Sequence, residues 1–310
     1  MFELDVHHDT KLRLAAFAAL RELTGPTGGV ISRGAMTTGF SFEGGRIPFA
    51  LRARGIWKPG RLGPDGAALS LTTASNRKGT TPRYDDQVAS DDGWFEYRYQ
   101  GTDPNAADNR AVRRALESRL PLIYFYGVGP GRYEAIWPVY VVGDEPSQLT
   151  FRVAADTAGM ADPTLLTGGA EAPFKRYATA IVKRRLHQHR FRELVVGAYR
   201  ERCTVCHLHH SELLDAAHIL EDKDVRGKPE VPNGLALCKI HHGAYDANIL
   251  GITPDLEIQV REDILAEVDG PMLKHGLQEM HGKLITVPGS VGLRPRAEYL
   301  AARFERFRAA

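Results

Sequence analysis

The sequence predicts an α+β protein of two domains, and three observations lead to this fold class. Between residues 82 and 153 the patterns follow the order strand, helix, strand pair, which favours a curved α+β barrel. Residues 155–173 shift to small residues, Gly and Pro, as is typical of a linker. All three cysteines and six of the twelve histidines then fall between residues 203 and 246. We therefore expect a barrel domain at 1–160 and a metal-clamped domain at 161–310.

The first half of the chain contains the patterns of the barrel. Residues 10–24 carry apolar side chains near the helical period and are followed by Gly25-Pro26, so they predict an amphipathic helix. Short alternating runs at 30–57 and a Pro/Gly-rich loop at 58–65 indicate scaffold without chemistry. We expect strands at 94–100, 122–128 and 133–142, and a helix at 108–118. The GVGPG run at 127–131 joins two strands and lacks the Lys-Ser/Thr of a phosphate loop, so it predicts a hairpin turn.

The second half opens with a basic segment. Residues 175–202 carry nine Lys and Arg against Glu193 and Glu201, in a helical pattern. Such a run is either a solvated helix face or a clamp for phosphates. Helical patterns return at 260–282 and 294–308, and we expect these segments to pack against the module before them or against a second subunit.

The cysteines have the spacing of a metal site. Cys203 and Cys206 are separated by two residues, as are Cys238 and His241. Two such knuckles match the ligand spacing of a tetrahedral Zn²⁺ site, and the chain has no fourth cysteine for a competing pairing. Adjacent helical side chains point about 100° apart, so His241 and His242 do not easily share one ion. We assign His241 to zinc and His242 to a second, catalytic metal.

The residues between the knuckles resemble those of a nuclease family. In order they are the Ala-His218-Ile run, Asn233-Gly-Leu, and the Leu-Cys238-x-x-His-His242 sequence. This order resembles the HNH (ββα-metal) nucleases, in the branch clamped by a cysteine-rich zinc site. The resemblance implies a core at 203–250, hydrolysis of phosphodiesters, and products with 5′-phosphate and 3′-hydroxyl ends. His218 would be the general base, because a neutral imidazole accepts a proton near pH 7.

The resemblance leaves two questions open in the catalytic set. Asn233 would either ligate the catalytic metal or pin the loop that carries the base, and we favour pinning. The family often has Asp or His directly before the base, where this chain has Ala217, so another ligand is needed. Asp215 is the nearest carboxylate, either as a ligand or as a support, and Asp246 is a further supporting candidate. The expected ion is Mg²⁺ or Mn²⁺.

The barrel segment resembles a second family, over about 70 residues. The matching features are Tyr84-Asp85-Asp86, Tyr99-Gln100-Gly101, Asn109-Arg110-Ala111, Pro121-Leu122 and the strand at 133–139. These resemble the SRA domain, a relative of the PUA-like fold that flips a 5-modified cytosine out of duplex DNA.

That resemblance implies a set of base-reading residues. Tyr84 and Tyr99 would stack on the flipped base, and Asp85 or Asp86 would read its edge, with Asp103 as a further candidate. Gln100 stands where the family commonly has a small hydroxyl residue. The alternative is that the strand tyrosines belong to the barrel wall, as β-propensity alone predicts. We accept that alternative for Tyr97 and Tyr124.

Composition places limits on the partners and the compartment. The net charge is +2 and the pI about 8.4, so a nucleic-acid surface has to come from local clustering of basic residues. Three cysteines assigned to zinc leave none for disulfides, which suits a reducing compartment. No apolar run reaches 18 residues, and the acidic start lacks the order of a signal peptide. We expect a cytoplasmic protein with no membrane partner.

The two resemblances together imply a type IV-like, modification-dependent restriction endonuclease. It would recognise 5-methylcytosine or 5-hydroxymethylcytosine in double-stranded DNA by base flipping and cut nearby with its HNH site. One active site per chain cuts one strand, so we expect a homodimer or sequential nicking. The alternatives are an HNH endonuclease without modification dependence, and a zinc-containing DNA-binding protein that does not cleave.

Overall fold

The structure is a computed structural model that describes residues 2–25, 29–51, 54–73, 94–156, 172–221 and 223–310. The chain forms two compact units, Met1–Leu186 and His187–Ala310. The sequence predicts a domain boundary near residue 160. The two compact units meet inside helix α5 (Ala172–Ala198), the 27-residue helix that follows the expected linker.

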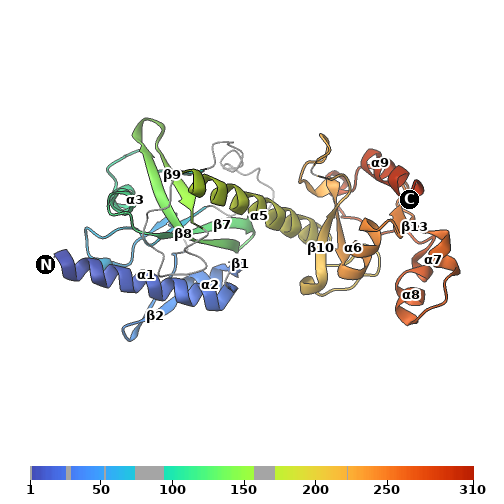
Figure 1. The fold of residues 1–310 in the computed structure, drawn as a ribbon, viewed down its shortest axis with the longest axis horizontal. Coiled ribbons are helices and arrows are strands. Elements are labelled where there is room, and N and C mark those ends of the chain that lie inside the picture. Colours follow the sequence, from blue (N-terminus) through green and yellow to red (C-terminus); the bar gives the residue numbers. More distant parts are fainter. Residues whose placement is uncertain (1, 26–28, 52–53, 74–93, 157–171, 222) are drawn as a thin grey trace. The chain divides into compact units, whose positions relative to one another are not determined.

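A seven-stranded sheet forms the centre of the first unit (Figure 1). Its strand order is β4-β5-β7-β8-β9-β6, and β1 pairs with β8. All pairs are antiparallel except β5 with β7. The outer strands β4 and β6 are not paired with each other within the described ranges, so the sheet is a curled half-barrel and not a closed barrel. The strands are β1 (Gly29–Ser32), β4 (Ile56–Trp57), β5 (Ser70–Thr72), β6 (Phe95–Arg98), β7 (Leu122–Gly129), β8 (Arg132–Glu145) and β9 (Thr150–Ala155).

The central strand β7 is buried on both faces. Tyr124 and Tyr126 point into one hydrophobic core, and Ile123 and Phe125 point into the other. This alternation follows from the two-residue period of a strand, and the run of large β-branched and aromatic residues suits burial on both faces. Tyr97 and Tyr124 lie in the first core, as the barrel-wall interpretation predicts.

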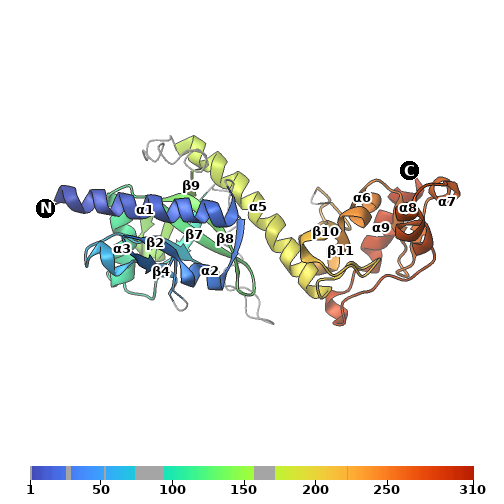
Figure 2. The same cartoon turned by 90° about the horizontal axis from the view of Figure 1, so that it is seen from below.

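Helix α1 (Phe2–Thr24) covers the second core, and Figures 1 and 2 show it running alongside the sheet. Its apolar face contributes Leu12, Phe17 and Leu20, all almost fully buried. The buried Arg13 donates to the carbonyls of Ala68 (2.9 Å) and Pro121 (2.8 Å), and so ties the helix to two loops. Helix α2 (Arg33–Thr38) and the hairpin of β2 (Phe40–Phe42) and β3 (Gly45–Ile47) complete this layer.

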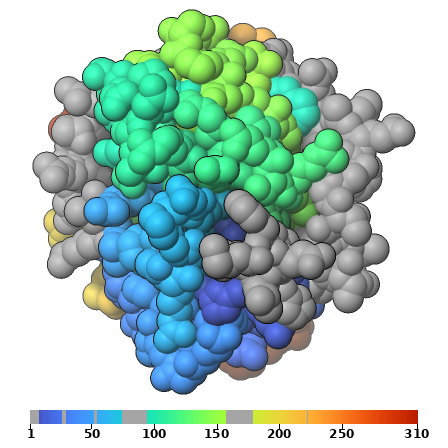
Figure 3. Space-filling view, turned by 90° about the vertical axis from the view of Figure 1, so that its left-hand side faces the viewer, coloured from blue at the N-terminus to red at the C-terminus, as the bar shows by residue number. Residues whose placement is uncertain are grey.

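Helix α3 (Ala107–Glu117) packs on the other core through Ala111, Val112 and Ala115. The Ala68 backbone N–H donates to the Ala111 carbonyl at 2.9 Å, which joins segments far apart in sequence. Figure 3 shows a face of this unit on which the blue to cyan early segments lie directly beside the green segments that include α3. Among the described residues of this unit, short 3-10 turns lie at Gly60–Leu62 and Pro146–Gln148.

The first part of α5 belongs to this unit, which explains where the division falls. Val182 and Leu186 are buried in the core beside α3, and Thr179 accepts a hydrogen bond from the Ala155 N–H at 2.9 Å. Arg185 pairs with the fully buried Glu134 of β8 at 3.2 Å. The basic segment is therefore helical, as predicted, and its first part is packed against the sheet.

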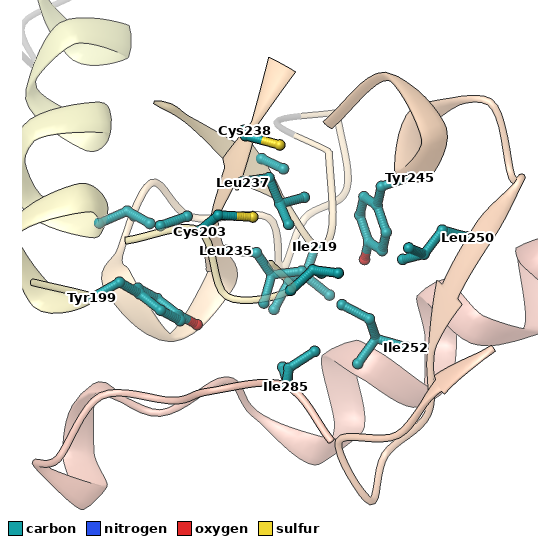
Figure 4. Packing of buried hydrophobic residues seen from close by; sticks show 14 of the residues in the cluster. Tyr199, Cys203, Ile219, Leu235, Leu237, Cys238, Tyr245, Leu250, Ile252 and Ile285 are labelled. Carbon is teal, nitrogen blue, oxygen red and sulfur yellow. The ribbon is translucent and has the colours of Figure 1, made fainter. Parts of the chain in front are cut away.

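The second unit is built from two small hairpins and several helices. Its elements are β10 (Leu214–His218), β11 (Gly234–Cys238), α6 (Lys239–Asp246), β12 (Leu250–Ile252), β13 (Ile258–Val260), α7 (Glu262–Ala266), α8 (Pro271–Gly276) and α9 (Ala297–Arg308), with 3-10 turns at Ser211–Leu213, Val231–Asn233, Gln278–Met280 and Val291–Leu293. Figure 4 shows their core, where Tyr245 of α6 meets Leu250 and Ile252 of β12.

The mixed α+β class is confirmed, and so are most of the predicted elements. The predicted helices at 10–24 and 108–118 and the three predicted strands coincide with α1, α3, β6, β7 and β8. The expected helix at 260–282 is instead broken into α7, α8 and a 3-10 turn. Across the described ranges, the longest helices are too polar to cross a membrane.

Candidate functional site

The hairpin of β10 and β11, followed directly by α6, holds the predicted site residues. The two strands pair antiparallel, with Leu214 opposite Cys238 and His218 opposite Gly234. Cys238 ends β11 and is also the N-cap of α6, so the chain passes from strand to helix without a loop. This ββα order brings residues from 203 to 246 together in one small module.

The four predicted zinc ligands meet at one end of the hairpin. Cys203, Cys206, Cys238 and His241 have ligand atoms that all lie within 4.8 Å of one another. The sulfurs of Cys206 and Cys238 are 3.9 Å apart, and Nδ1 of His241 is 3.1 Å from the Cys238 sulfur. A tetrahedral ion with bonds of about 2.3 Å to sulfur places its ligand atoms roughly 3.8 Å apart. The group therefore fits a metal ion.

The orientation of His241 is fixed by a backbone group from outside the motif. Its Nε2 lies 2.7 Å from the carbonyl oxygen of Gly276, the last residue of α8. In the neutral, metal-binding form of the imidazole, donation of Nε2–H to this carbonyl leaves Nδ1 as the lone-pair nitrogen, which faces the sulfurs of Cys203 and Cys238. The short helix α8 thus supports the metal group.

Crowding changes the ionisation of these ligands. Hydrogen bonds with Cys203 and Cys206 hold the pKa of the Cys238 thiol far below its usual range. Burial lowers the pKa of His241, but hydrogen bonds with Cys203 and Cys238 outweigh this and raise it to about 10. Hydrogen bonds with Cys203 and Cys238 hold the pKa of the Cys206 thiol far above its usual range. A metal ion therefore has to displace protons from Cys206 and His241, so its binding weakens as the pH falls.

Asn233 is fully buried and bonds to the backbone that follows His218. Its Oδ1 accepts from the Leu220 N–H at 2.9 Å, and its Nδ2 donates to the Leu220 carbonyl at 3.0 Å and the Lys228 carbonyl at 3.1 Å. Its own carbonyl accepts from the Ile219 N–H at 2.9 Å. The side-chain amide is thus engaged with main-chain groups, the arrangement that a pin for the loop after the base requires.

His218 is the last residue of β10 and is half-buried. Its imidazole lies flat against the ring of Phe191 of α5, with the ring centroids 3.9 Å apart and the planes 13° from parallel. One face of the imidazole is therefore covered by the Phe191 ring.

His242 lies between two carboxylates. Its Nδ1 is 3.6 Å from Oδ2 of Asp215 on β10, and its Nε2 is 3.4 Å from Oδ2 of Asp246 one helical turn later. The imidazole is about three-quarters buried, whereas Asp246 is largely exposed. The structure therefore brings His242 to both carboxylates that the sequence singled out.

Two cations share Asp215 with His242. Lys239 forms an ion pair with Oδ2, and Nε of Arg192 lies 3.6 Å from Oδ1. Among the residues that the structure describes, the Cys3His group is the one set of three or more potential ligands close enough for a single ion. Asp215 and Asp246 each lie close to His242, but the three residues do not form such a cluster.

Comparison with known proteins agrees with this geometry. Residues 203–253 match the family model of the HNH endonuclease, a range that contains the Cys3His group, His218, Asn233 and His242. The second unit thus contains an HNH endonuclease domain. The protein is a DNA endonuclease. No curated protein matches the sequence.

Two solved structures are similar to the endonuclease. One is a "Modification dependent TagI restriction endonuclease", with 16% identity and a TM-score of 0.31 over 82% of this chain and 85% of the other. The second is the "Type IV phosphorothioation-dependent restriction endonuclease ScoMcrA", with 14% identity and a TM-score of 0.22 over 93% of this chain and 58% of the other.

The first unit of the endonuclease contains the candidate base-reading residues. Tyr84, Asp85 and Asp86 lie outside the described residues. Tyr99 is only 7% exposed, its ring packs on Phe151 with centroids 4.4 Å apart, and its hydroxyl bonds to Asp144. Stacking of Tyr99 on a base would require the ring to leave this packing.

Gln100 and its neighbours are held by Asn109, which is fully buried. Its side chain accepts from the Gln100 N–H at 2.9 Å and donates to the carbonyls of Gln100 at 3.2 Å and Asp103 at 2.8 Å. Gln100 itself is exposed, as is Asp103. The Asn109-Arg110-Ala111 feature thus fixes the loop that carries both candidates.

The sequence did not reveal several contacts of the HNH domain in the endonuclease. Gly276 acts through a carbonyl, which every residue has, and therefore leaves no residue-type signal. Phe191 and Arg192 lie in the basic helical segment, more than 20 residues before β10. Lys239 stands directly after Cys238, and its pairing with Asp215 depends on the antiparallel pairing of β10 with β11, so its residue type alone gave no signal.

The Cys3His group and His242 should separate under mutation. Cys238→Ser should lose one tightly bound metal ion per chain and unfold the second unit, because the ion supplies folding free energy. His242→Ala should keep that ion and the fold but lose DNA cleavage. The measurement is metal content of the purified variants by mass spectrometry, with circular dichroism for the fold. Full occupancy in a soluble Cys238→Ser protein would refute the ligand set.

Proposed function

We propose that this DNA endonuclease cuts phosphodiesters with His218 as the general base, next to a divalent ion bound at His242. The observation that carries the proposal is the engagement of Asn233 with the backbone on both sides of Leu220, directly after the base. A zinc-stapled module without chemistry needs only its four ligands. The buried amide of Asn233 fixes the segment that follows His218 at the end of β10. Such support is expected for a histidine whose position matters for catalysis.

The chemistry follows from the chain's own groups. A neutral His218 imidazole accepts a proton from the attacking water, and its placement at the end of β10 keeps it oriented. His242, with Asp215 and Asp246 beside it, would hold Mg²⁺ or Mn²⁺, which supplies charge neutralisation at the phosphate and at the leaving oxygen. Cys203, Cys206, Cys238 and His241 would hold Zn²⁺, which suits three sulfurs and one imidazole.

The cations around Asp215 support a phosphate substrate. Lys239 is more than half exposed although it is paired with Asp215, and Arg192 is partly exposed beside it. A DNA strand brings one negative charge per nucleotide, and exposed Lys and Arg bind it with loss of counterions. The net charge of only +2 makes such local clustering necessary.

His218→Ala should abolish cleavage while folding, metal content and DNA binding persist. Loss of a general base lowers the rate by about 10²- to 10⁴-fold. His210→Ala is the matched control, because His210 is an exposed histidine of the same domain. Cleavage rates under single-turnover conditions decide the matter, and a near-normal rate for His218→Ala would remove it from the mechanism.

We further propose that the first unit selects DNA that carries 5-methylcytosine or 5-hydroxymethylcytosine, by base flipping. The resemblance on Tyr84, Asp85 and Asp86 supports this, with Tyr84 as the stacking ring, because Tyr99 is packed in the core. A carboxylate accepts a hydrogen bond from the N4 amino group of cytosine. It rejects thymine, whose O4 is an acceptor although thymine also carries a 5-methyl group.

Asp86→Ala, with Asp85→Ala for comparison, should weaken binding of methylated duplex by about 1–3 kcal/mol. Non-specific, salt-dependent binding should be unchanged, since it rests on phosphate contacts. Asp65→Ala is the control, as an exposed aspartate outside the resemblance. Competition between methylated and unmethylated duplexes is the measurement.

If both aspartate variants and Tyr84→Ala keep the preference, or the unaltered protein has none, the first unit does not read modified cytosine. The alternative is then an HNH endonuclease without modification dependence. Because one HNH site cuts one strand, double-strand cleavage by this protein would need a homodimer or two sequential nicks.

A further inference from the structure

One side chain of α5 lies against the proposed base, and the hairpin leaves room for it. The ring of Phe191 is stacked on the His218 imidazole at 3.9 Å and 13°, and Phe191 itself is 3% exposed. A nearly parallel stack at this distance restricts rotation of the imidazole about its χ2 bond. It also keeps water from one face of the ring.

The space for Phe191 exists because the residue opposite His218 is a glycine. Gly234 pairs with His218 across the two strands. A Cβ added to Gly234 would lie 2.9 Å from Cζ of Phe191 and 2.4 Å from Cγ2 of Val195. Any side chain there would push α5 away, so the glycine forms the slot into which the Phe191 ring fits.

Helix α5 is attached to both strands on either side of this slot. Arg192 donates to the Leu214 carbonyl of β10 at 2.9 Å and to the Ser211 carbonyl at 2.6 Å. Tyr199 donates its hydroxyl hydrogen to the Gly234 carbonyl of β11 at 3.1 Å. These bonds fix the helix segment that carries Phe191 relative to the strand end that carries His218.

We propose that Phe191 is a positioning residue that sets the orientation of the His218 imidazole for proton transfer from water. The inference rests on the proposed role of His218 as general base. Proton transfer needs the accepting nitrogen within hydrogen-bond reach and in line with the water, so a freely rotating ring is productive for only part of the time. Because Phe191 is 3% exposed, it would act through His218 and not by contact with DNA.

The direct test of the stack is proton NMR of the full-length protein. The imidazole C–H protons of His218 lie over the Phe191 ring and should be shifted upfield by its ring current, with assignment by loss of the signals in His218→Ala. In Phe191→Leu the signals should return to ordinary histidine positions. Ordinary positions in the unaltered protein would overturn the proposal, whatever the variants do.

Kinetics test the consequence. Phe191→Leu should lower the single-turnover cleavage rate by about 10- to 100-fold, with DNA affinity within about twofold, because misplacement of a catalytic group affects the reaction and not ground-state binding. Phe191→Met serves if the leucine variant does not fold. Val195→Ala is the matched control: it removes buried apolar volume from the same helix at the same glycine but leaves the stack, so its rate should stay within about twofold of normal.

The outcomes also separate this inference from the proposed function. If His218→Ala is inactive while a folded, metal-loaded Phe191→Leu cleaves at the normal rate, Phe191 has no positioning role and His218 remains the base. If Val195→Ala loses as much rate as Phe191→Leu, the effect comes from core packing and the inference is wrong. If His218→Ala itself cleaves normally, the proposed function fails first.

Discussion

Three thiols and an imidazole in mutual contact fix the geometry on which the catalytic part of this protein depends. Cys238 is at once the end of β11, the N-cap of α6 and a member of the Cys3His group. His241 follows one turn later, so two ligands set the angle between the strand and the helix. His242 must then point away from that group, because adjacent helical residues diverge by about 100°. The group that stabilises the fold therefore also directs His242 toward Asp215 and Asp246.

The rest of the site is positioned by the strand register. His218 pairs with Gly234, so the proposed base lies opposite a residue without a side chain. Asn233 directly precedes this glycine in the chain. Asn233 then holds the backbone after the base, and Phe191 fills the slot that the glycine leaves. A slip of one residue would turn every side chain of β10 to the other face. The zinc-type clamp at one end of the hairpin and the Asn233 bonds at the other prevent such a slip.

Short-range spacing accounts for what the sequence revealed. The Cys3His group, the Asn233 contacts and the neighbours of His242 all lie within about 45 residues of one another, where spacing and residue type carry information. In the first unit, periodicity predicted α1, α3 and the main strands. Tyr97 and Tyr124 are wall tyrosines, as β-propensity predicted, and Tyr99 and Tyr126 lie in the same core.

Long-range packing accounts for what the sequence did not reveal. The sheet is a half-barrel because β4 and β6 do not meet within the described ranges, and no local pattern encodes that. The basic helix was interpreted by its charge, yet Phe191 and Val182 bury it in two different cores. Tyr99 stands at a base-reading position by sequence, but its contacts with Phe151 and Asp144 depend on strands formed some 45 residues later. Gly276 contributes only its backbone carbonyl, which contacts His241, and a backbone group leaves no residue-type signal in the sequence.

The central claim is that hydrolysis occurs at a divalent-ion site distinct from the Cys3His group. Its most direct test is plasmid nicking by protein that retains its tightly bound ion after weakly bound ions have been removed by dialysis against a mild chelator. With Mg²⁺ or Mn²⁺ added back, nicking should rise from background and saturate while the content of the tightly bound ion stays constant. Full activity without added ion, or activity that tracks only the tightly bound ion, would contradict the account.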